Sequence, residues 1–405
     1  ADETRHMSLR AGGRIRAGQA KDDHPLTRDK IGQVYRLVSI VAGPDQLRRW
    51  NLISYTNSHA AVVLMIALGF VADITLGSVM ARGNEMAGIV VVGAGQAGAS
   101  LVAKLRSLGY EGELTLVGAE AQPPYQRPPL SKAYLLGEME EARLYLRPET
   151  FYAEQEIALR LNAPVTGLNA STRTLEIGGE TLAFDQLALT TGAIPNRLPA
   201  ALGGDLDHVF TVRTLADIDR MSPLFQRNAR VLVVGGGYIG LEAAAVASKL
   251  GLRVTLVEMA DRILGRVAAP ETADYFRDLH RSHGVDLREG VGLERLTGHE
   301  GQVSGAILTD GPVLEVDFVI VGTGIRPDMR LAEAGGLACD NGIIVDDMGR
   351  TSSAGIWAAG DCAVFPYRSG SIRLESVQNA IDQAEAVAAN MLGAEAAYVP
   401  KPWFW

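Results

Sequence analysis

Glycines recur in the same order at two distant places in this chain. They stand at G-x-G-x-x-G spacing at Gly93, Gly95 and Gly98, and again at Gly235, Gly237 and Gly240. Each set follows a short aliphatic run and precedes an apolar pattern of helical period. In such a turn the glycines let the backbone approach a pyrophosphate, and the amides at the helix N-terminus face its charge. A single copy is a weak signal, whereas two copies indicate two dinucleotides bound by one chain.

An acidic residue is expected at the end of the strand after each glycine turn, where it would bind ribose hydroxyls. Glu258 follows the second such strand, so it favours NAD and would repel the extra phosphate of NADP. Arg262 and Arg266 lie close behind it and leave open a site for that phosphate. After the first turn Glu120 is the candidate, because Ala119 occupies the preceding position.

A proline-rich loop at 123–132 ends in Lys132. Proline restricts the backbone, so this loop could hold the lysine beside a ring system. The alternative is that Lys132 is solvated near a helix start. The two cysteines, Cys339 and Cys362, lie far from this loop and from each other in sequence. We therefore expect neither a disulfide framework nor a structural zinc site.

Strands and helices must place these residues. The expected elements after the first turn are a helix at 97–108, a strand at 113–117 and a hairpin at 172–177 and 180–184. Two later apolar strands mirror each other, and each ends in a glycine turn, at Gly192 and at Gly324. A last strand leads to Ala-Gly-Asp361, which places this carboxylate where a sugar chain and phosphate could be held. The alternation of strands and helices predicts an α/β fold.

Composition agrees with that class. The chain has 405 residues, 47% of them hydrophobic, and 45 glycines, which leaves room for two or three domains. Its net charge of −9 gives no reason to expect nucleic acid or an anionic membrane as a partner. The low cysteine content suits a reducing cytoplasm, and no metal site is expected.

Residues 1–85 do not match the rest of the chain. They contain a basic, glycine-rich stretch and an apolar segment at 60–81 that Asp73 interrupts. Three interpretations remain open: a non-native or disordered leader upstream of a true start at Met86, a membrane anchor, or a signal peptide. We favour the leader, because Met86 stands just before the first strand, and we expect no membrane association unless 60–81 is an anchor.

The motifs together resemble one family. From Ile89 to Trp405 the chain contains GAGQAG, PYQRPPLSK, GGGYIGLE, VGTGIRPD, AAGDCA, ESVQNA and PWFW. It resembles the bacterial FAD-dependent ferredoxin reductases that serve cytochrome P450 and aromatic-ring dioxygenase systems, which have the pyridine nucleotide-disulfide oxidoreductase fold. The resemblance implies two interleaved, three-layer, Rossmann-like domains, with FAD bound by 86–200 and 326–395 and NAD by 201–325. Residues 396–405 would then begin a C-terminal interface domain that is truncated here.

The resemblance also implies site residues by position. The first glycine turn would bind FAD, with contacts at Gly93, Gly95, Ala97, Gly98, Lys132, Val165, Asp361 and Val377. The second turn would bind NADH through Gly235, Gly237, Gly240 and Glu258. We add Glu120, Gly192 and Gly324 to the cofactor-binding set, and Trp403 matches a tryptophan near the electron exit. One departure is Ile194, which replaces an arginine that contacts FAD in many relatives, with Arg197 as a candidate substitute.

Three residues would act on the chemistry. Tyr238 resembles a tyrosine that covers the flavin until nicotinamide displaces it. Glu242 would lie near the nicotinamide and pair with Lys132, and Lys132 would favour negative charge on the reduced flavin. Disulfide reductases of this fold need a redox thiol beside the flavin, and neither cysteine lies in the matching loop, so electrons should leave to an external acceptor. We expect Cys362 to be a buried structural residue.

The implied activity is that of a ferredoxin–NAD(+) reductase. Electrons would pass from NADH through FAD to a 2Fe–2S ferredoxin of a P450 or ring-hydroxylating dioxygenase system. The alternative is an NADH-binding flavoprotein resembling apoptosis-inducing factor, which would act by interaction rather than turnover.

Overall fold

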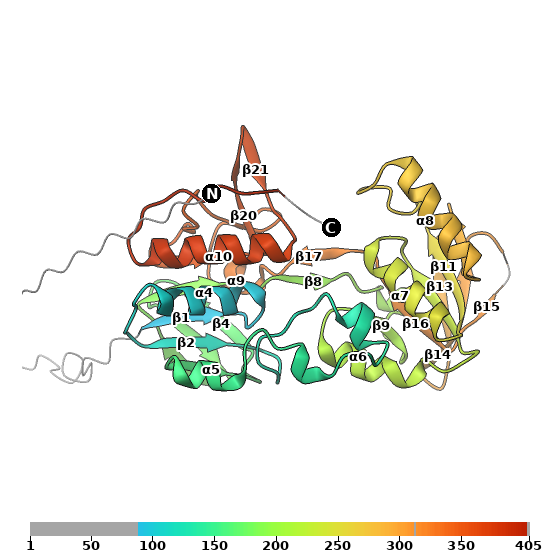
Figure 1. Ribbon diagram of the computed structural model, residues 1–405, viewed down its shortest axis with the longest axis horizontal. Helices are drawn as coiled ribbons and strands as arrows, with labels where there is room; N and C mark the ends of the chain where they lie inside the picture. Colours follow the sequence, from blue (N-terminus) through green and yellow to red (C-terminus); the bar gives the residue numbers. More distant parts are fainter. Residues whose placement is uncertain (1–87, 312, 403–405) are drawn as a thin grey trace, which may run out of the picture. The chain divides into compact units, whose positions relative to one another are not determined.

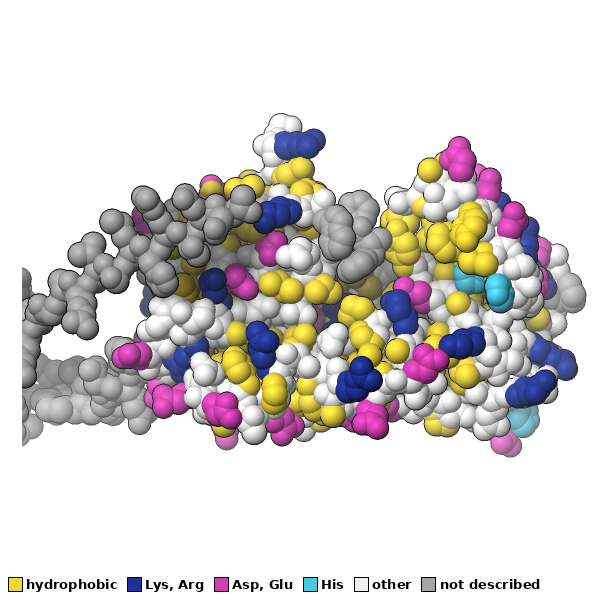
Figure 2. Space-filling model, viewed as in Figure 1, with side chains coloured by type: hydrophobic (Ala, Val, Ile, Leu, Met, Phe, Trp, Pro, Cys, Tyr) yellow, Lys and Arg dark blue, Asp and Glu magenta, His cyan; other side chains and the backbone are white. Residues whose placement is uncertain are grey.

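The computed structural model describes residues 88–311 and 313–402 (Figure 1). The expectations for residues 1–85, for Met86 and for Trp403 lie outside these ranges. Within them, no helix has the length and apolar character needed to cross a membrane. On the face drawn in Figure 2, acidic and basic side chains are interspersed, so the negative net charge is not gathered into one patch there.

The first glycine turn follows the central strand of a five-stranded parallel sheet. Its strand order is β19-β7-β1-β2-β3, and its strands are β1 (Ile89–Val92), β2 (Leu114–Val117), β3 (Ile157–Arg160), β7 (Gln186–Leu189) and β19 (Ile356–Ala358). Successive side chains of β1 point to opposite faces, and all four are buried. Both faces are therefore covered, as parallel sheets require.

Different layers cover the two faces. Ile89 and Val91 pack with α4 (Gln96–Ser107) and α10 (Val377–Met391), which lie side by side (Figure 1). Val90 and Val92 pack instead with an antiparallel sheet of β4 (Val165–Asn169), β5 (Thr174–Ile177) and β6 (Glu180–Ala183). The β5–β6 pair confirms the predicted hairpin.

A second five-stranded parallel sheet repeats this design. Its order is β12-β11-β10-β16-β9, from β9 (Val209–Thr211), β10 (Arg230–Val234), β11 (Arg253–Glu258), β12 (Asp286–Glu289) and β16 (Phe318–Val321). Val231 and Val233 pack against a helical layer that includes α6 (Leu215–Met221), α7 (Tyr238–Lys249) and α8 (Pro270–Ser282). Leu232 and Val234 pack against antiparallel β13 (Leu293–His299), β14 (Gln302–Leu308) and β15 (Leu314–Glu315).

The two three-layer units are interleaved, which confirms the predicted fold class. Strands of the second sheet come from residues 209–321, and the chain then returns to add β19 to the first sheet. The outgoing and returning segments pair as antiparallel strands β8 (Ala193–Pro195) and β17 (Ile325–Pro327), with Ile194 opposite Arg326. The remaining α-helices and strands are α5 (Glu149–Glu154), α9 (Arg330–Ala334), β18 (Ile343–Ile344), β20 (Ala363–Tyr367) and β21 (Gly370–Ile372).

Candidate functional site

One large cavity, of about 1900 Å³, is lined by both glycine turns. The carboxyl ends of the central strands β1 and β10 lead into these turns, and ligands of open α/β sheets bind beyond such strand ends. The lining includes fourteen predicted site residues: Gly93, Gly95, Ala97, Glu120, Lys132, Gly192, Gly235, Gly237, Tyr238, Glu242, Glu258, Gly324, Asp361 and Val377.

The first glycine turn has the geometry that its spacing predicts. Gly93 has φ +114°, a conformation that side chains rarely adopt. A Cβ on Gly98 would lie 2.1 Å from the Gly93 carbonyl oxygen, so Gly98 serves close packing rather than the cavity wall. A Cβ on Gly95 would meet no atom within 4 Å, because this backbone faces open space. Helix α4 begins directly after Gly95 without a side-chain cap, so its first amides are available to a phosphate.

The second turn repeats each of these features. Gly235 has φ +108°, a Cβ on Gly240 would lie 1.9 Å from the Gly235 carbonyl oxygen, and a Cβ on Gly237 would meet nothing within 4 Å. Helix α7 also begins without a side-chain cap or an acidic residue in its first turn. Two glycine turns of the same geometry thus face one cavity.

Glu258 is fixed at the end of β11 on the cavity wall. Its two carboxylate oxygens accept hydrogen bonds from the backbone N–H of Gly236 at 2.7 Å and of Ala260 at 2.9 Å. Each oxygen keeps a further lone pair for a ribose hydroxyl. Arg262 donates instead to the carbonyls of Ala268 and Gly265, so its guanidinium is engaged within its own loop.

The first unit has no equivalent acid at this position. Strand registers align Val92 with Val117 and Val234 with Val257, so Gly118 stands where the second unit has Glu258. Glu120 lines the cavity two residues later, but its carboxylate is already paired. Glu120 thus reaches the cavity with both carboxylate oxygens bonded, and its role in ribose binding stays a prediction.

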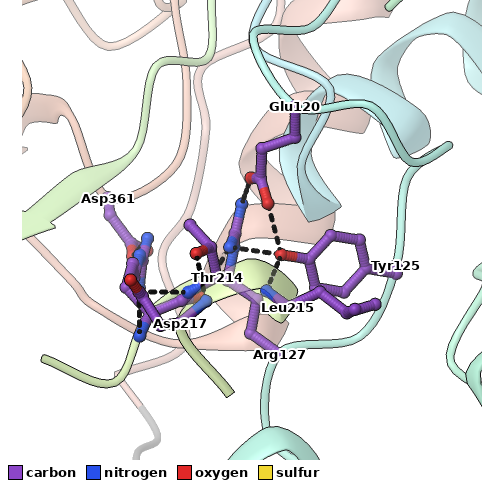
Figure 3. Close-up of polar contacts among 8 residues, drawn as sticks. Glu120, Tyr125, Arg127, Thr214, Leu215, Asp217 and Asp361 are labelled. Carbon is purple, nitrogen blue, oxygen red and sulfur yellow. Dashed lines mark hydrogen bonds and ion pairs between the residues drawn. The ribbon is translucent and has the colours of Figure 1, made fainter. Parts of the chain in front are cut away.

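The partners of Glu120 connect the proline-rich loop to the second unit (Figure 3). Arg127 donates to one carboxylate oxygen at 2.6 Å, and the Tyr125 hydroxyl donates to the other at 2.5 Å. The same hydroxyl accepts the N–H of Leu215 at the start of α6, and Arg127 also donates to the Arg213 carbonyl. Burial raises the pKa of Tyr125, so the phenol stays protonated.

Arg213 is a cavity residue that sequence reasoning missed. Its guanidinium lies 3.7 Å from the Asp361 carboxylate and 3.4 Å from the position of a Cβ on Gly192. Burial raises the pKa of Asp361, and attraction to Arg213 opposes that rise. The cation beside Gly192 therefore comes from Arg213 on the segment after β9, whereas Ile194 and Arg197 do not line this cavity.

The expected pairing of Lys132 with Glu242 is confirmed. Lys132 Nζ lies 2.7 Å from Glu242 Oε2, and the Ser131 hydroxyl donates to the same oxygen at 2.6 Å. The loop leads into a single irregular helical turn, in which the backbone of Lys132 is non-helical. Tyr238, the first residue of α7, lies 41% exposed at the cavity wall. A cation held by a carboxylate and a partly exposed aromatic ring thus share this cavity.

Three described residues of the predicted set do not line the cavity: Gly98 and Gly240, which pack closely within their turns, and Val165. Val165, at the start of β4, packs beside the core of the first unit and does not line the cavity. Val377 does line it, as the first residue of α10.

The comparison with protein families decides the assignment. The family model described as pyridine nucleotide-disulphide oxidoreductase matches residues 87–384. The chain belongs to this family. Among relatives, the chain is 41% identical to rhodocoxin reductase of Rhodococcus erythropolis over 320 residues, covering 78% of this chain and 75% of that protein. It is 42% identical to the 5,5'-dehydrodivanillate O-demethylase ferredoxin reductase subunit of a Sphingobium species, covering 78% of each.

A solved structure of the family supports the same fold. The crystal structure of the covalent putidaredoxin reductase–putidaredoxin complex matches with a TM-score of 0.75 and 39% identity, over 78% of each chain. This agreement extends to the interleaved architecture described above.

The family name refers to disulphide chemistry, yet the cysteines of this member do not line the cavity. Cys362 is fully buried, and its thiol contacts the carbonyls of Leu189 and Ala359. Burial raises the pKa of the Cys362 thiol and of the Cys339 thiol, and both are free. The expectation that Cys362 is a buried structural residue is confirmed.

Proposed function

We propose that this chain is an FAD-dependent NADH:ferredoxin oxidoreductase. The observation that carries the proposal is the pair of matching glycine turns facing one cavity, whose wall also holds Glu258 and the Lys132–Glu242 pair. Rhodocoxin reductase and the ferredoxin reductase subunit, both more than 40% identical, support the same activity class.

We assign FAD to the first turn and NADH to the second. The open space at the Cβ positions of Gly95 and Gly237 leaves room for a pyrophosphate at each turn. Residues 86–200 and 326–395 would form the FAD-binding domain, with Asp361, Val377 and Glu120 among its contacts. Residues 201–325 would form the NAD-binding domain, in which Glu258 reads the ribose.

A bound flavin would supply the conversion of two-electron into one-electron chemistry. The residues of the protein would position the two cofactors and polarise the flavin ring. Glu242 holds the Lys132 ammonium at the cavity wall, where it would favour negative charge on a neighbouring ring. Tyr238 would cover that ring and move aside when nicotinamide enters.

The proposed electron acceptor is a 2Fe–2S ferredoxin in the cytoplasm. The named relatives are reductases of ferredoxins or of rhodocoxin, and the matched crystal structure contains putidaredoxin. The absence of cysteines from the cavity lining agrees with an acceptor outside the protein.

The test measures flavin binding, nucleotide preference and acceptor together. The purified chain is reconstituted with FAD and reduced anaerobically with NADH or NADPH, and ferredoxin-dependent cytochrome c reduction follows with a panel of 2Fe–2S ferredoxins. We expect a yellow protein that NADH bleaches faster than NADPH and that turns over with at least one ferredoxin. A chain that remains colourless with FAD would contradict the proposal. A long-lived reduced complex with no acceptor turnover would favour the interaction-only flavoprotein.

A further inference from the structure

Two buried amide side chains on α10 are not explained by core packing. Asn379 and Gln383 are 3% and 1% exposed, one helical turn apart. Amides are mostly exposed in proteins, and a buried one is retained where its hydrogen bonds are satisfied. Both lie in the first half of α10, which begins at the cavity with Val377.

Gln383 connects α10 to the turn that presents Asp361. Its Oε1 accepts the backbone N–H of Gly360 at 2.8 Å. Gly360 has φ +83°, and a Cβ on it would lie 3.0 Å from the Ala97 side chain on α4. The position of Gly360 therefore sets the approach of Asp361 to the cavity and the packing against the first turn of α4.

Asn379 connects the same point to the segment before α10. Its Nδ2 donates to the Leu374 carbonyl at 3.2 Å and to Gln383 Oε1 at 3.5 Å. Leu374 lines the cavity. On its other side, Asn379 Oδ1 accepts the hydroxyl of Tyr398 at 3.0 Å.

Tyr398 closes this network from the C-terminal segment. Its ring packs edge-on against Phe365, and its N–H donates to the Asp347 carbonyl at 2.7 Å. A continuous path of hydrogen bonds thus runs from Tyr398 through Asn379 and Gln383 to Gly360. Hydrogen bonds are stronger in a buried network than in water, so the network favours one arrangement of the segments that it joins.

We propose that Asn379 and Gln383 are positioning residues for the dinucleotide at the first glycine turn. They hold the Gly360–Asp361 turn and the Leu374–Val377 segment in one fixed geometry, and Tyr398 secures them. This inference rests on the proposed binding of FAD by the first unit.

The experiment measures the dissociation constant of FAD from the apoprotein by fluorescence titration, with the thermal midpoint of each apoprotein alongside. Gln383→Leu removes the acceptor of the buried Gly360 N–H, so we expect about tenfold weaker FAD binding. Gln383→Glu keeps an oxygen at that position and should restore part of the affinity. Tyr398→Phe is the milder variant if Gln383→Leu does not fold, and it should weaken FAD binding about threefold.

The matched control is Asn390→Leu. Asn390 is also a buried amide of α10, 3% exposed, but it bonds Met348 and Ala396 at the end far from Val377. It should lower the thermal midpoint and leave FAD affinity unchanged. An equal loss of FAD affinity in Gln383→Leu and Asn390→Leu would overturn the inference. Unchanged FAD affinity in both Gln383→Leu and Tyr398→Phe would also overturn it. Failure of the unaltered chain to bind FAD would instead contradict the proposed function.

Discussion

Removal of the Glu258 charge should change which nicotinamide nucleotide this protein prefers. The carboxylate accepts the N–H groups of Gly236 and Ala260 and is held on the cavity wall. Like unit charges 4 Å apart repel by about 1 kcal/mol in water and by about 4 kcal/mol at an effective dielectric constant of 20. Glu258 is half-buried, so we expect its repulsion of a 2′-phosphate to lie between these limits.

The variant Glu258→Gln keeps the shape and loses the charge. Relief of about 1.4 kcal/mol of repulsion would raise kcat/KM for NADPH about tenfold. For NADH we expect about a tenfold loss, because the amide cannot accept both backbone N–H groups and binds the ribose less strongly. The ratio of the two kcat/KM values should therefore move about a hundredfold towards NADPH.

Steady-state reduction of a ferredoxin with each nucleotide measures this ratio. Glu289→Gln is the matched control, because Glu289 lies opposite Glu258 on the neighbouring strand β12 and bonds Arg277 outside the cavity. Glu289→Gln should lower the free energy of unfolding and leave the ratio of the two kcat/KM values unchanged. An unchanged ratio in Glu258→Gln, or an equal change in both variants, would refute the assignment of Glu258 as the ribose reader.

Three further predictions follow from other contacts. Gly98→Ala should lower the thermal midpoint strongly, because its Cβ would overlap a carbonyl oxygen, whereas Gly95→Ala should leave the midpoint unchanged and reduce the flavin content of the purified protein. Lys132→Met should slow flavin reduction by NADH in stopped-flow measurements. A double-mutant cycle with Glu242→Gln should show coupling between the two residues, and additive effects on the rate would contradict a role of the Lys132–Glu242 pair in flavin reduction. Tyr152→Phe should raise the free energy of unfolding by about 1 kcal/mol, because the hydroxyl is buried and has no hydrogen-bond partner among the described residues. Burial raises the pKa of Tyr152 from 10.0 to about 12. The unfolded chain therefore loses this proton at lower pH than the folded chain, and the free energy of unfolding falls between pH 10 and pH 12. The phenylalanine variant should lose less stability in that interval, as urea unfolding would measure.

The glycine turns could be predicted in detail because their roles are local. The tight turn, the open approach and the helix packing all lie within six residues, and Gly240 has the same close contact as Gly98. Glu258 was predictable for the same reason, since the end of a strand follows from its apolar run. The fold class followed because the turn-and-strand pattern occurs twice.

The residues that sequence reasoning missed depend on side-chain contacts between distant segments. Arg213 and Asp361 are 148 positions apart in the sequence, and no rule of residue spacing predicts such a pair. The expectation that Glu120 binds a ribose stays a prediction, and its bonds to Tyr125 and Arg127 could not be read from the sequence. Which partner a carboxylate takes depends on where the proline-rich loop folds back, and that conformation is not encoded in a local pattern.

The paired strands β8 and β17 bring the entry and exit of residues 196–324 to one point. Opposed residues of an antiparallel pair lie about 4.5–5.5 Å apart, so Ile194 and Arg326 are near enough for a short turn to join them. The second unit is therefore an insertion that leaves and rejoins the chain at one point, but its core is shared, because Tyr125 and Leu130 of the first unit pack in the same cluster as Leu215. An exchange of one nucleotide-binding module for another at this junction would therefore also have to supply new partners for the proline-rich loop.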